Sequence, residues 1–166
     1  MLVNIQSLKN GRFDLEESVD LSDVQLDTDD VEFLNTFKVS IVGEKFHLNY
    51  RMTISFDGEV KFPCDRCAEP FVCSISDSTS VIYTKTDMTD DESDEEIIRI
   101  ENDAKDIDIS NELVEAIVLS FPMKRIHDSA CKGVCACGAN LNKEECTCEE
   151  KIDPRWEALV KLKNKN

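Results

Sequence analysis

Five of the eight cysteines of this chain fall within the stretch CKGVCACGANLNKEECTC, residues 131–148. Two more, Cys64 and Cys67, lie much earlier and are separated by two residues. Such a distribution admits disulfides, redox thiols, buried small residues or metal ligands. The choice among these decides whether distant parts of the chain are joined, so the cysteines constrain the fold more than any other feature.

The expected compartment bears on this choice. The N-terminal sequence MLVNIQSLKNGRFDLEES has no basic segment followed by an apolar run, so it is not typical of a secretory signal. No apolar run approaches the roughly 20 residues that a membrane span needs. We therefore expect a cytoplasmic protein with no membrane contact, in which thiols stay reduced or bind metal.

The pair Cys64 and Cys67 has the spacing of a zinc knuckle, because a two-residue gap lets both sulfurs of a tight turn reach one ion. The same spacing occurs in thioredoxin-like redox motifs, which open a helix after a strand. Here the surroundings have a β pattern and Pro70 follows closely, which disfavours a redox role. We predict structural zinc, one or two ions. The candidate ligands are Cys64, Cys67, Cys131, Cys135, Cys137, Cys146 and Cys148.

The exact ligand set stays open. His127 is a candidate eighth ligand, since eight ligands would complete two four-coordinate sites, but a lone histidine in a turn is more often a surface residue. Cys135 and Cys137 are separated by one residue, as are Cys146 and Cys148. In an extended backbone the two side chains of each pair would point apart. Each pair would chelate only in a tight turn, or each would donate one sulfur.

Much of the first half of the chain has the two-residue periodicity of β-strands. Between residues 46 and 56, apolar side chains at every even position alternate with polar ones, which predicts one long strand with a single apolar face. Asp57-Gly58 then predicts a turn, and Asn10-Gly11 predicts a tight hairpin near the N-terminus. With shorter runs at 37–41, 71–75 and 81–83, we expect an antiparallel meander with one solvent-exposed face.

The second half has a different pattern. Residues 86–96, TDMTDDESDEE, carry seven acidic side chains and no basic one, which predicts a flexible acidic loop. Apolar residues at helical spacing follow Ser110, a candidate N-cap, and Pro122 would end that helix. Asp153-Pro154 is typical of the start of a further helix.

Together these patterns predict a single α+β domain over residues 1–166. Its core is an antiparallel β-sheet or partly open β-barrel, with one or two C-terminal helices and a cysteine-rich metal-binding segment. We place the β-rich part at 1–85, the flexible acidic loop at 86–106, and the helices with the zinc segment at 107–166.

The formal net charge of −16 limits the classes of partner. A general electrostatic contact with nucleic acid or an anionic membrane needs an excess of Lys and Arg. The charge instead favours a basic protein partner, with the cationic C-terminal tail as a local exception. Arg155, Lys161 and Lys163 of that tail are candidate contacts with RNA or a partner. With two histidines and no phosphate-binding loop, the chain has no catalytic constellation, so we expect neither an enzyme nor a small-molecule substrate.

Four blocks of the sequence resemble the YceD family, described as large ribosomal RNA subunit accumulation proteins. The blocks are PCDRCAEPF (63–71), LSFPMKRIHDS (119–129), CKGVCACGANLN (131–142) and DPRWEALVKL (153–162). The resemblance implies a non-enzymatic factor in the synthesis or accumulation of large-subunit ribosomal RNA, and hence in ribosome biogenesis. Family members are commonly encoded beside a zinc-ribbon protein of the large subunit, which implies a basic ribosomal protein or a large-subunit precursor as partner.

The resemblance also bears on the cysteines. It implies that Cys64 and Cys67 form the family's most regular pair, and that Cys135 and Cys137 fall on its C-terminal pair. This chain departs from the family there, because members usually have two residues between the second pair and this chain has one.

Two other functions stay open at this point. A direct RNA-binding zinc ribbon would need Lys124, Arg125 and Lys132 on one face with the basic tail. A thiol-disulfide oxidoreductase would use Cys64 and Cys67, and it is the less favoured of the two.

Overall fold

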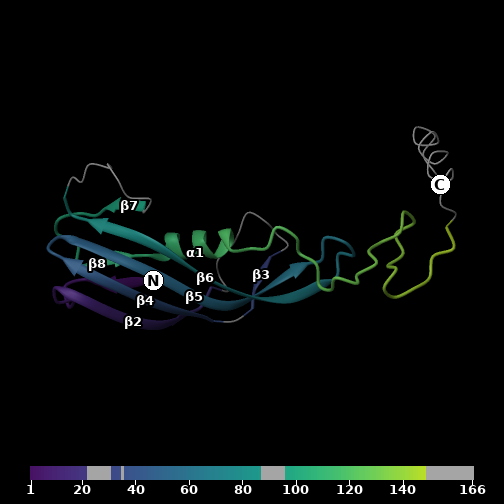
Figure 1. Cartoon of the computed structure of the whole chain (residues 1–166), viewed down its shortest axis with the longest axis horizontal. Coiled ribbons are helices and arrows are strands. Elements are labelled where there is room, and N and C mark those ends of the chain that lie inside the picture. Colours follow the sequence, from purple (N-terminus) through teal and green to yellow (C-terminus); the bar gives the residue numbers. More distant parts are fainter. Residues whose placement is uncertain (22–30, 35, 87–95, 149–166) are drawn as a thin grey trace, which may run out of the picture.

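The computed structural model describes residues 1–21, 31–34, 36–86 and 96–148. These residues form an elongated molecule with the strands at one end and the cysteine-rich segment at the other (Figure 1). The elements in chain order are β1 (Leu2–Asn4), β2 (Gly11–Val19), β3 (Glu32–Phe33), β4 (Phe37–Phe46), β5 (Asn49–Pro63), β6 (Pro70–Thr84), β7 (Glu96–Arg99), β8 (Asp106–Asp108) and α1 (Ser110–Leu119).

The centre of the fold is an antiparallel meander. Strands β4, β5 and β6 pair in sequence order, and β2 pairs with the free side of β4. Strand β7 adds to β6 in parallel, and β3 pairs with part of β5. The predicted antiparallel sheet is confirmed in its main part. In the described ranges the strand order ends at β2 and β7, so the sheet is open and does not close into a barrel.

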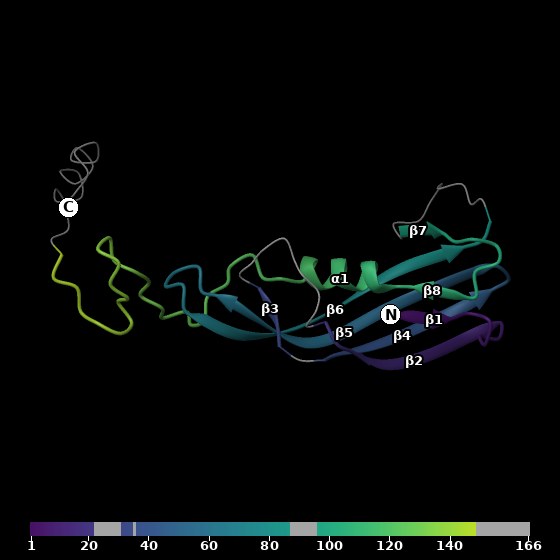
Figure 2. The same cartoon turned by 180° about the vertical axis from the view of Figure 1, so that it is seen from behind.

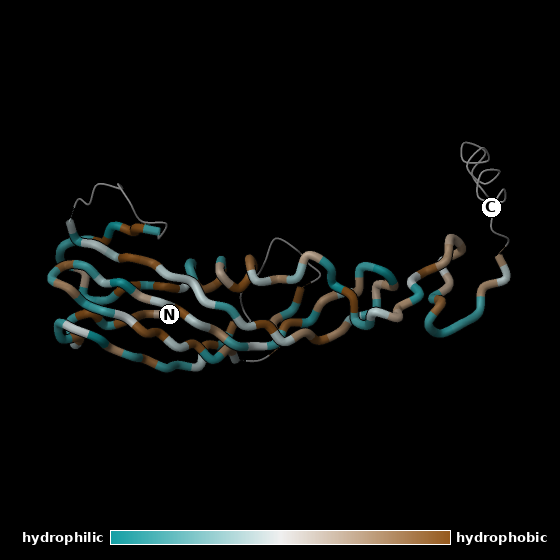
Figure 3. Tube along the Cα trace, viewed as in Figure 1, coloured by the Kyte–Doolittle hydropathy of each residue, from teal (hydrophilic) through white to brown (hydrophobic). Residues whose placement is uncertain are grey.

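One face of this sheet carries the hydrophobic core. Ile41 of β4 and Met52 and Ile54 of β5 are fully buried on it. Strands β1 and β8 and helix α1 lie over the same face (Figure 2), and Leu113 and Ile117 of α1 join the core cluster. Hydropathy alternates along the strands (Figure 3), since successive side chains point to opposite faces. The predicted single apolar face is therefore confirmed.

The turn between β4 and β5 differs from the prediction. The chain reverses at His47-Leu48, where His47 has a positive φ of 57°. The predicted strand over 46–56 is therefore wrong at its beginning, because Phe46 ends β4. The alternation of apolar and polar residues continues through this two-residue turn, so periodicity alone does not reveal the turn.

The predicted turn at Asp57-Gly58 is also wrong, because both residues lie inside β5. Gly58 serves packing instead: a Cβ at this position would lie 2.5 Å from the ring of Phe37, which is fully buried. The missing side chain makes room for an aromatic ring on the core face.

The predicted hairpin at Asn10-Gly11 is wrong as well. Strand β1 does not pair with β2; it pairs with β8, which places Val3 opposite Ile107. Gly11 has a φ of +110° and begins β2, which pairs with β4. The partner of β1 comes from the second half of the chain, so local turn chemistry carries no information about it.

We expect Gly43→Ala to destabilise the fold, because Gly43 has no free space above its Cα. A Cβ there would lie 2.4 Å from the ring of Phe13 and 2.7 Å from the backbone oxygen of Arg51. Overpacking of this kind costs about 1–3 kcal/mol. Urea unfolding followed by circular dichroism should show a lower midpoint. Ser40→Ala, on the opposite face of β4, is the control and should stay within about 0.5 kcal/mol of wild type.

Helix α1 is the helix predicted after Ser110, but Ser110 begins the helix and does not cap it. Ile109 occupies the N-cap position and makes no side-chain capping bond. The carboxylate of Asp108 accepts hydrogen bonds from the backbone amide of Ser110 at 3.0 Å and from its hydroxyl. It also pairs with the N-terminal amine of Met1 at 3.3 Å. The helix ends before Pro122, as predicted.

These contacts give the stability an expected pH dependence. Hydrogen bonds from Ser110, and after them the N-terminal amine, hold the pKa of Asp108 below its usual value of 3.8. A lowered pKa means that the carboxylate stabilises the fold above pH 3.8 and that this contribution is lost as the pH falls through the folded-state pKa. Asp108→Asn should therefore reduce stability at pH 6, by at most about 1 kcal/mol because the group is exposed. In urea titrations the difference from wild type should shrink as the pH is lowered below 3.8.

The predicted acidic loop over 86–106 is too long at its C-terminal end, because Glu96–Arg99 form β7. Residues 87–95 of that loop and the helix predicted from Asp153 lie outside the described residues. The assignment of one domain to 1–166 stays a prediction. No helix in the described ranges is long and apolar enough to cross a membrane.

Candidate metal centre

The structure sorts seven cysteines and one histidine into two groups. We call Cys64, Cys67, His127 and Cys131 the inner site, and Cys135, Cys137, Cys146 and Cys148 the outer site. Within each group, the candidate ligand atoms all lie within 4.8 Å of one another. Sulfur atoms from distant parts of the chain thus meet at the inner site.

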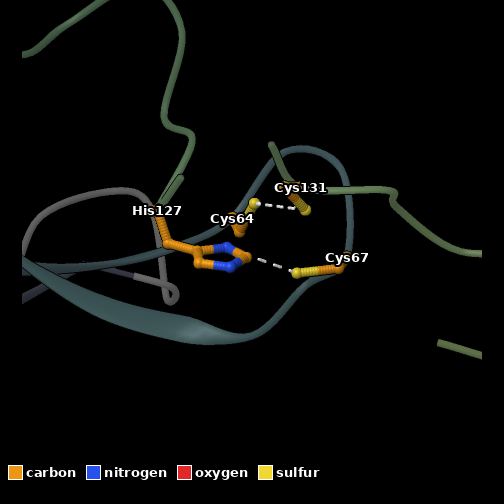
Figure 4. Close-up of side chains that lie close together, drawn as sticks. All are labelled: Cys64, Cys67, His127 and Cys131. Carbon is orange, nitrogen blue, oxygen red and sulfur yellow. Dashed lines mark hydrogen bonds between the residues drawn. The ribbon is translucent and has the colours of Figure 1, made fainter. Parts of the chain in front are cut away.

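The inner site begins at the end of the β5–β6 hairpin. Cys64 directly follows β5, and the turn closes when the amide of Ala68 donates to the carbonyl of Cys64 at 2.8 Å. The amide of Cys64 in turn donates to the carbonyl of Glu69 at 2.9 Å. Ala68 takes a positive φ of 58° to complete this tight turn. The turn aims the sulfurs of Cys64 and Cys67 at the same point (Figure 4).

His127 and Cys131 reach the hairpin from the segment that follows α1. The amide of Asp65 donates to the carbonyl of Arg125 at 2.7 Å, and the amide of Arg125 donates to the carboxylate of Asp65 at 2.8 Å. This reciprocal pair anchors the segment just before His127. Beyond it, the guanidinium of Arg66 donates to the carbonyl of Cys131 at 2.8 Å. Contacts on both sides therefore hold the two later ligands against the turn.

The inner site fits a zinc ion. Zn–S bonds of about 2.3 Å and Zn–N bonds of about 2.0 Å in a tetrahedron require S···S separations of about 3.8 Å and S···N separations of about 3.6 Å. The Sγ atoms of Cys64 and Cys131 are 4.0 Å apart, and Cys67 Sγ lies 3.6 Å from His127 Nδ1. The three cysteines are at most 5% exposed and pack against Phe71 and Ile126. These donors are typical of a closed, structural zinc site.

The outer site is built within one short segment. Cys146 Sγ lies 3.2 Å from Cys135 Sγ and 3.5 Å from Cys137 Sγ. The backbone turns tightly here: the amide of Gly138, at a φ of +92°, donates to the carbonyl of Cys135 at 2.9 Å. This turn removes the objection to the one-residue gap between Cys135 and Cys137, and the sulfurs of Cys146 and Cys148 lie within 4.8 Å of theirs. Four thiols are also a donor set that suits zinc.

The surroundings of two thiols favour the deprotonated form that binds metal. Burial alone would raise the pKa of Cys64, but hydrogen bonds from the backbone amides of His127 and Arg66 and from the His127 side chain lower it to about 5. The backbone amide of Cys137 is the main cause that lowers the pKa of Cys135 to about 7. Both sites therefore contain a sulfur that is readily ionised near neutral pH.

Sequence reasoning missed the polar side chains that join the two sites. Glu69, in the loop after Cys67, accepts hydrogen bonds from Lys143 at 2.6 Å and from Asn140 at 3.3 Å. The amide nitrogen of the Asn142 side chain lies 3.3 Å from Cys131 Sγ, and its oxygen accepts from the backbone amide of Lys132 at 2.8 Å. Asn140 and Asn142 lie in the block CKGVCACGANLN, so the sequence signal for these contacts is two amide side chains close to the cysteines.

The grouping decides what the spacing left open. Cys131 joins Cys64 and Cys67, and His127, expected more often as a surface residue, lies with them although its own side chain is exposed. Cys135 and Cys137 belong to the other group. Whether metal binds stays a prediction. Arg155, Lys161 and Lys163 lie outside the described residues.

Comparisons with known proteins agree with the motifs. The family described as large ribosomal RNA subunit accumulation protein YceD matches residues 52–163. An Arabidopsis thaliana protein named "Large ribosomal RNA subunit accumulation protein YCED homolog 1, chloroplastic" is 50% identical over 52 residues, which is 30% of this chain and 16% of that protein. An uncharacterised protein of Mycobacterium tuberculosis is 29% identical over 102 residues, 60% of this chain and 48% of its own length.

The chain thus spans less than half of the length of these curated relatives. No solved structure matches it. The family match covers β5 from Met52 onward, the strands and helix that follow, and every residue of both candidate metal sites. This chain therefore belongs to the YceD family of large ribosomal RNA subunit accumulation proteins.

Proposed function

We propose that this chain is a non-enzymatic factor for large-subunit ribosomal RNA synthesis or accumulation, and thus for ribosome biogenesis. It acts as a zinc-stapled acidic adaptor that docks a large-subunit precursor or a basic ribosomal protein. The observation that carries the proposal is the family match over residues 52–163. The residues in both sites support a structural role for the metal, because a site closed by four protein ligands leaves no position for a reacting water.

In this proposal, Cys64, Cys67, His127 and Cys131 hold one zinc ion, and the four cysteines of the outer site hold a second. The bound ion at the inner site supplies a cross-link between the β5–β6 hairpin and the segment after α1. That link opposes the entropy of the long chain segment between Cys67 and His127. The result is a fixed segment at the end of the sheet, residues 125–148, which we call the arm and which a partner meets as a preformed surface.

The net charge of −16 supports a basic partner, since opposite charges speed the encounter and select the partner. The alternative of direct RNA binding finds less support. Arg125 stacks over the ring of Phe62 at 5.2 Å, and Arg66 donates to the carbonyls of Ser129 and Cys131, so these two guanidinium groups serve the fold. If RNA were the direct ligand, its affinity should fall steeply with salt.

The test is co-sedimentation of the tagged, full-length protein with ribosomal particles at low and moderate salt. We expect it to sediment with large-subunit precursors and to be absent from the fractions of mature small subunits. We also expect deletion of its gene to lower the ratio of large-subunit to small-subunit ribosomal RNA. Absence from large-subunit precursors at both salt concentrations, with an unchanged RNA ratio, would contradict the proposal. Binding to naked ribosomal RNA as tightly as to the particles would favour the alternative.

A further inference from the structure

The two candidate metal sites differ in how well they are shielded. At the inner site, Cys64, Cys67 and Cys131 are buried at the base of the arm. At the outer site, Cys137 and Cys148 are exposed, and Cys135 and Cys146 are half-buried. Oxidants in solution therefore reach the outer sulfurs directly, whereas the inner sulfurs lie beneath Phe71 and Ile126.

The outer sulfurs are also closer to the geometry of a disulfide. Cys146 Sγ lies 3.2 Å from Cys135 Sγ, and a disulfide bond needs about 2.05 Å, so a small movement brings the two atoms together. At the inner site, the sulfurs of Cys64 and Cys131 are 4.0 Å apart. They belong to two segments that the Asp65–Arg125 pair holds in place.

We propose that the outer site is an oxidant-sensitive zinc site, at which hydrogen peroxide converts Cys135 and Cys146 into a disulfide and releases the ion, while the inner site keeps its own. This inference rests on the proposed zinc binding and adds to it a covalent modification site. The inner site would then have a structural role, and the outer site would respond to oxidants.

The thiolates of Cys135 and Cys146 give up two electrons and form one S–S bond. The O–O bond of peroxide breaks, takes up these electrons with two protons from solvent, and leaves as two water molecules. Cys137 and Cys148 are left as two ligands, too few to hold zinc in a four-coordinate site. A dithiol reductant reverses the step by thiol–disulfide exchange.

The test uses the full-length protein loaded with zinc and treated with hydrogen peroxide. Zinc release is followed with a chromogenic chelator, and the product is analysed by native mass spectrometry and peptide mapping. We expect one of two ions to leave, faster than the other on the order of tenfold or more, since exposure governs thiolate oxidation. We also expect a disulfide between Cys135 and Cys146. After reduction of this disulfide and reloading with zinc, the protein should again hold two ions.

Two variants assign the released ion to its site. Cys146→Ser should bind one ion and keep it under the same peroxide treatment. Cys67→Ser removes an inner ligand, and its remaining ion should leave as fast as the first ion of the wild type. Release of the inner ion first, release of both ions at one rate, or release of neither would overturn this inference while leaving zinc binding intact. A wild-type chain that takes up no zinc on loading would instead refute the zinc-binding proposal on which the inference rests.

Discussion

Removal of zinc is expected to release the cysteine-rich arm and to leave the sheet folded. The core cluster that joins β4, β5, β6 and α1 contains no metal-site cysteine, and Cys64, Cys67 and Cys131 form a separate cluster. The arm has little apolar packing of its own, and apparent binding free energies of structural zinc in small domains are about 10–16 kcal/mol. After chelation, hydrogen exchange should accelerate strongly at the amides of Cys131, Cys135 and Leu141, with little change at those of β5.

The matching variant is Cys131→Ser, which removes one ligand of the inner site. Native mass spectrometry should show one bound ion in place of two. Hydrogen exchange should accelerate in the segment around residue 131, as it does when zinc is removed from the wild-type protein. Cys73→Ser is the control, because Cys73 lies on β6 outside both sites and should leave two ions bound. A cooperative loss of the whole β-sheet signal on chelation would contradict the separation of sheet and arm.

Phe62→Ala is expected to cause the largest loss of stability among single substitutions that leave the ligands intact. Phe62 is fully buried near the end of β5, with ring centroids of Phe121 at 4.9 Å and Phe71 at 6.3 Å. Truncating a buried phenylalanine costs about 3–5 kcal/mol. The cost should be in the upper part of this range, because Arg125, whose backbone anchors the arm, also loses the ring on which its guanidinium stacks.

Urea unfolding followed by far-UV circular dichroism measures this loss, together with the thermal midpoint. Phe46→Ala is the matched control: the same substitution at a side chain that is 67% exposed should change stability by about 0.5 kcal/mol or less. Equal losses of stability from the two substitutions would show that Phe62 does not stabilise the junction between sheet and arm.

Much of the sheet was predictable because the strands have one apolar face. The two-residue periodicity identifies the residues of β4, β5 and β6 that enter the core. Turn positions were predicted less well: Gly58 lies inside β5, where the ring of Phe37 occupies the space of the missing side chain. The dipeptide Asp57-Gly58 looks the same whether its glycine supplies a turn or admits the ring of Phe37, and only the packed sheet distinguishes the two.

The pairing of β1 with β8 shows the same limit over a longer distance. In each strand a buried apolar residue lies between two exposed polar or apolar ones, which is typical of a strand. Nothing near Val3 in the sequence identifies Ile107 as its partner. The choice depends on which strands the folded sheet leaves unpaired, and that is a property of the whole chain.

The sequence by itself determined which side chains are metal-ligand candidates, since two thiols with two residues between them in a tight turn can face one ion. The tertiary structure alone decided that there are two groups, and that His127 and Cys131 complete the first. The reason is that local spacing fixes the direction of neighbouring sulfurs, whereas the approach of distant ones depends on contacts such as the Asp65–Arg125 pair, which exist only once β5, β6 and the segment after α1 are folded together.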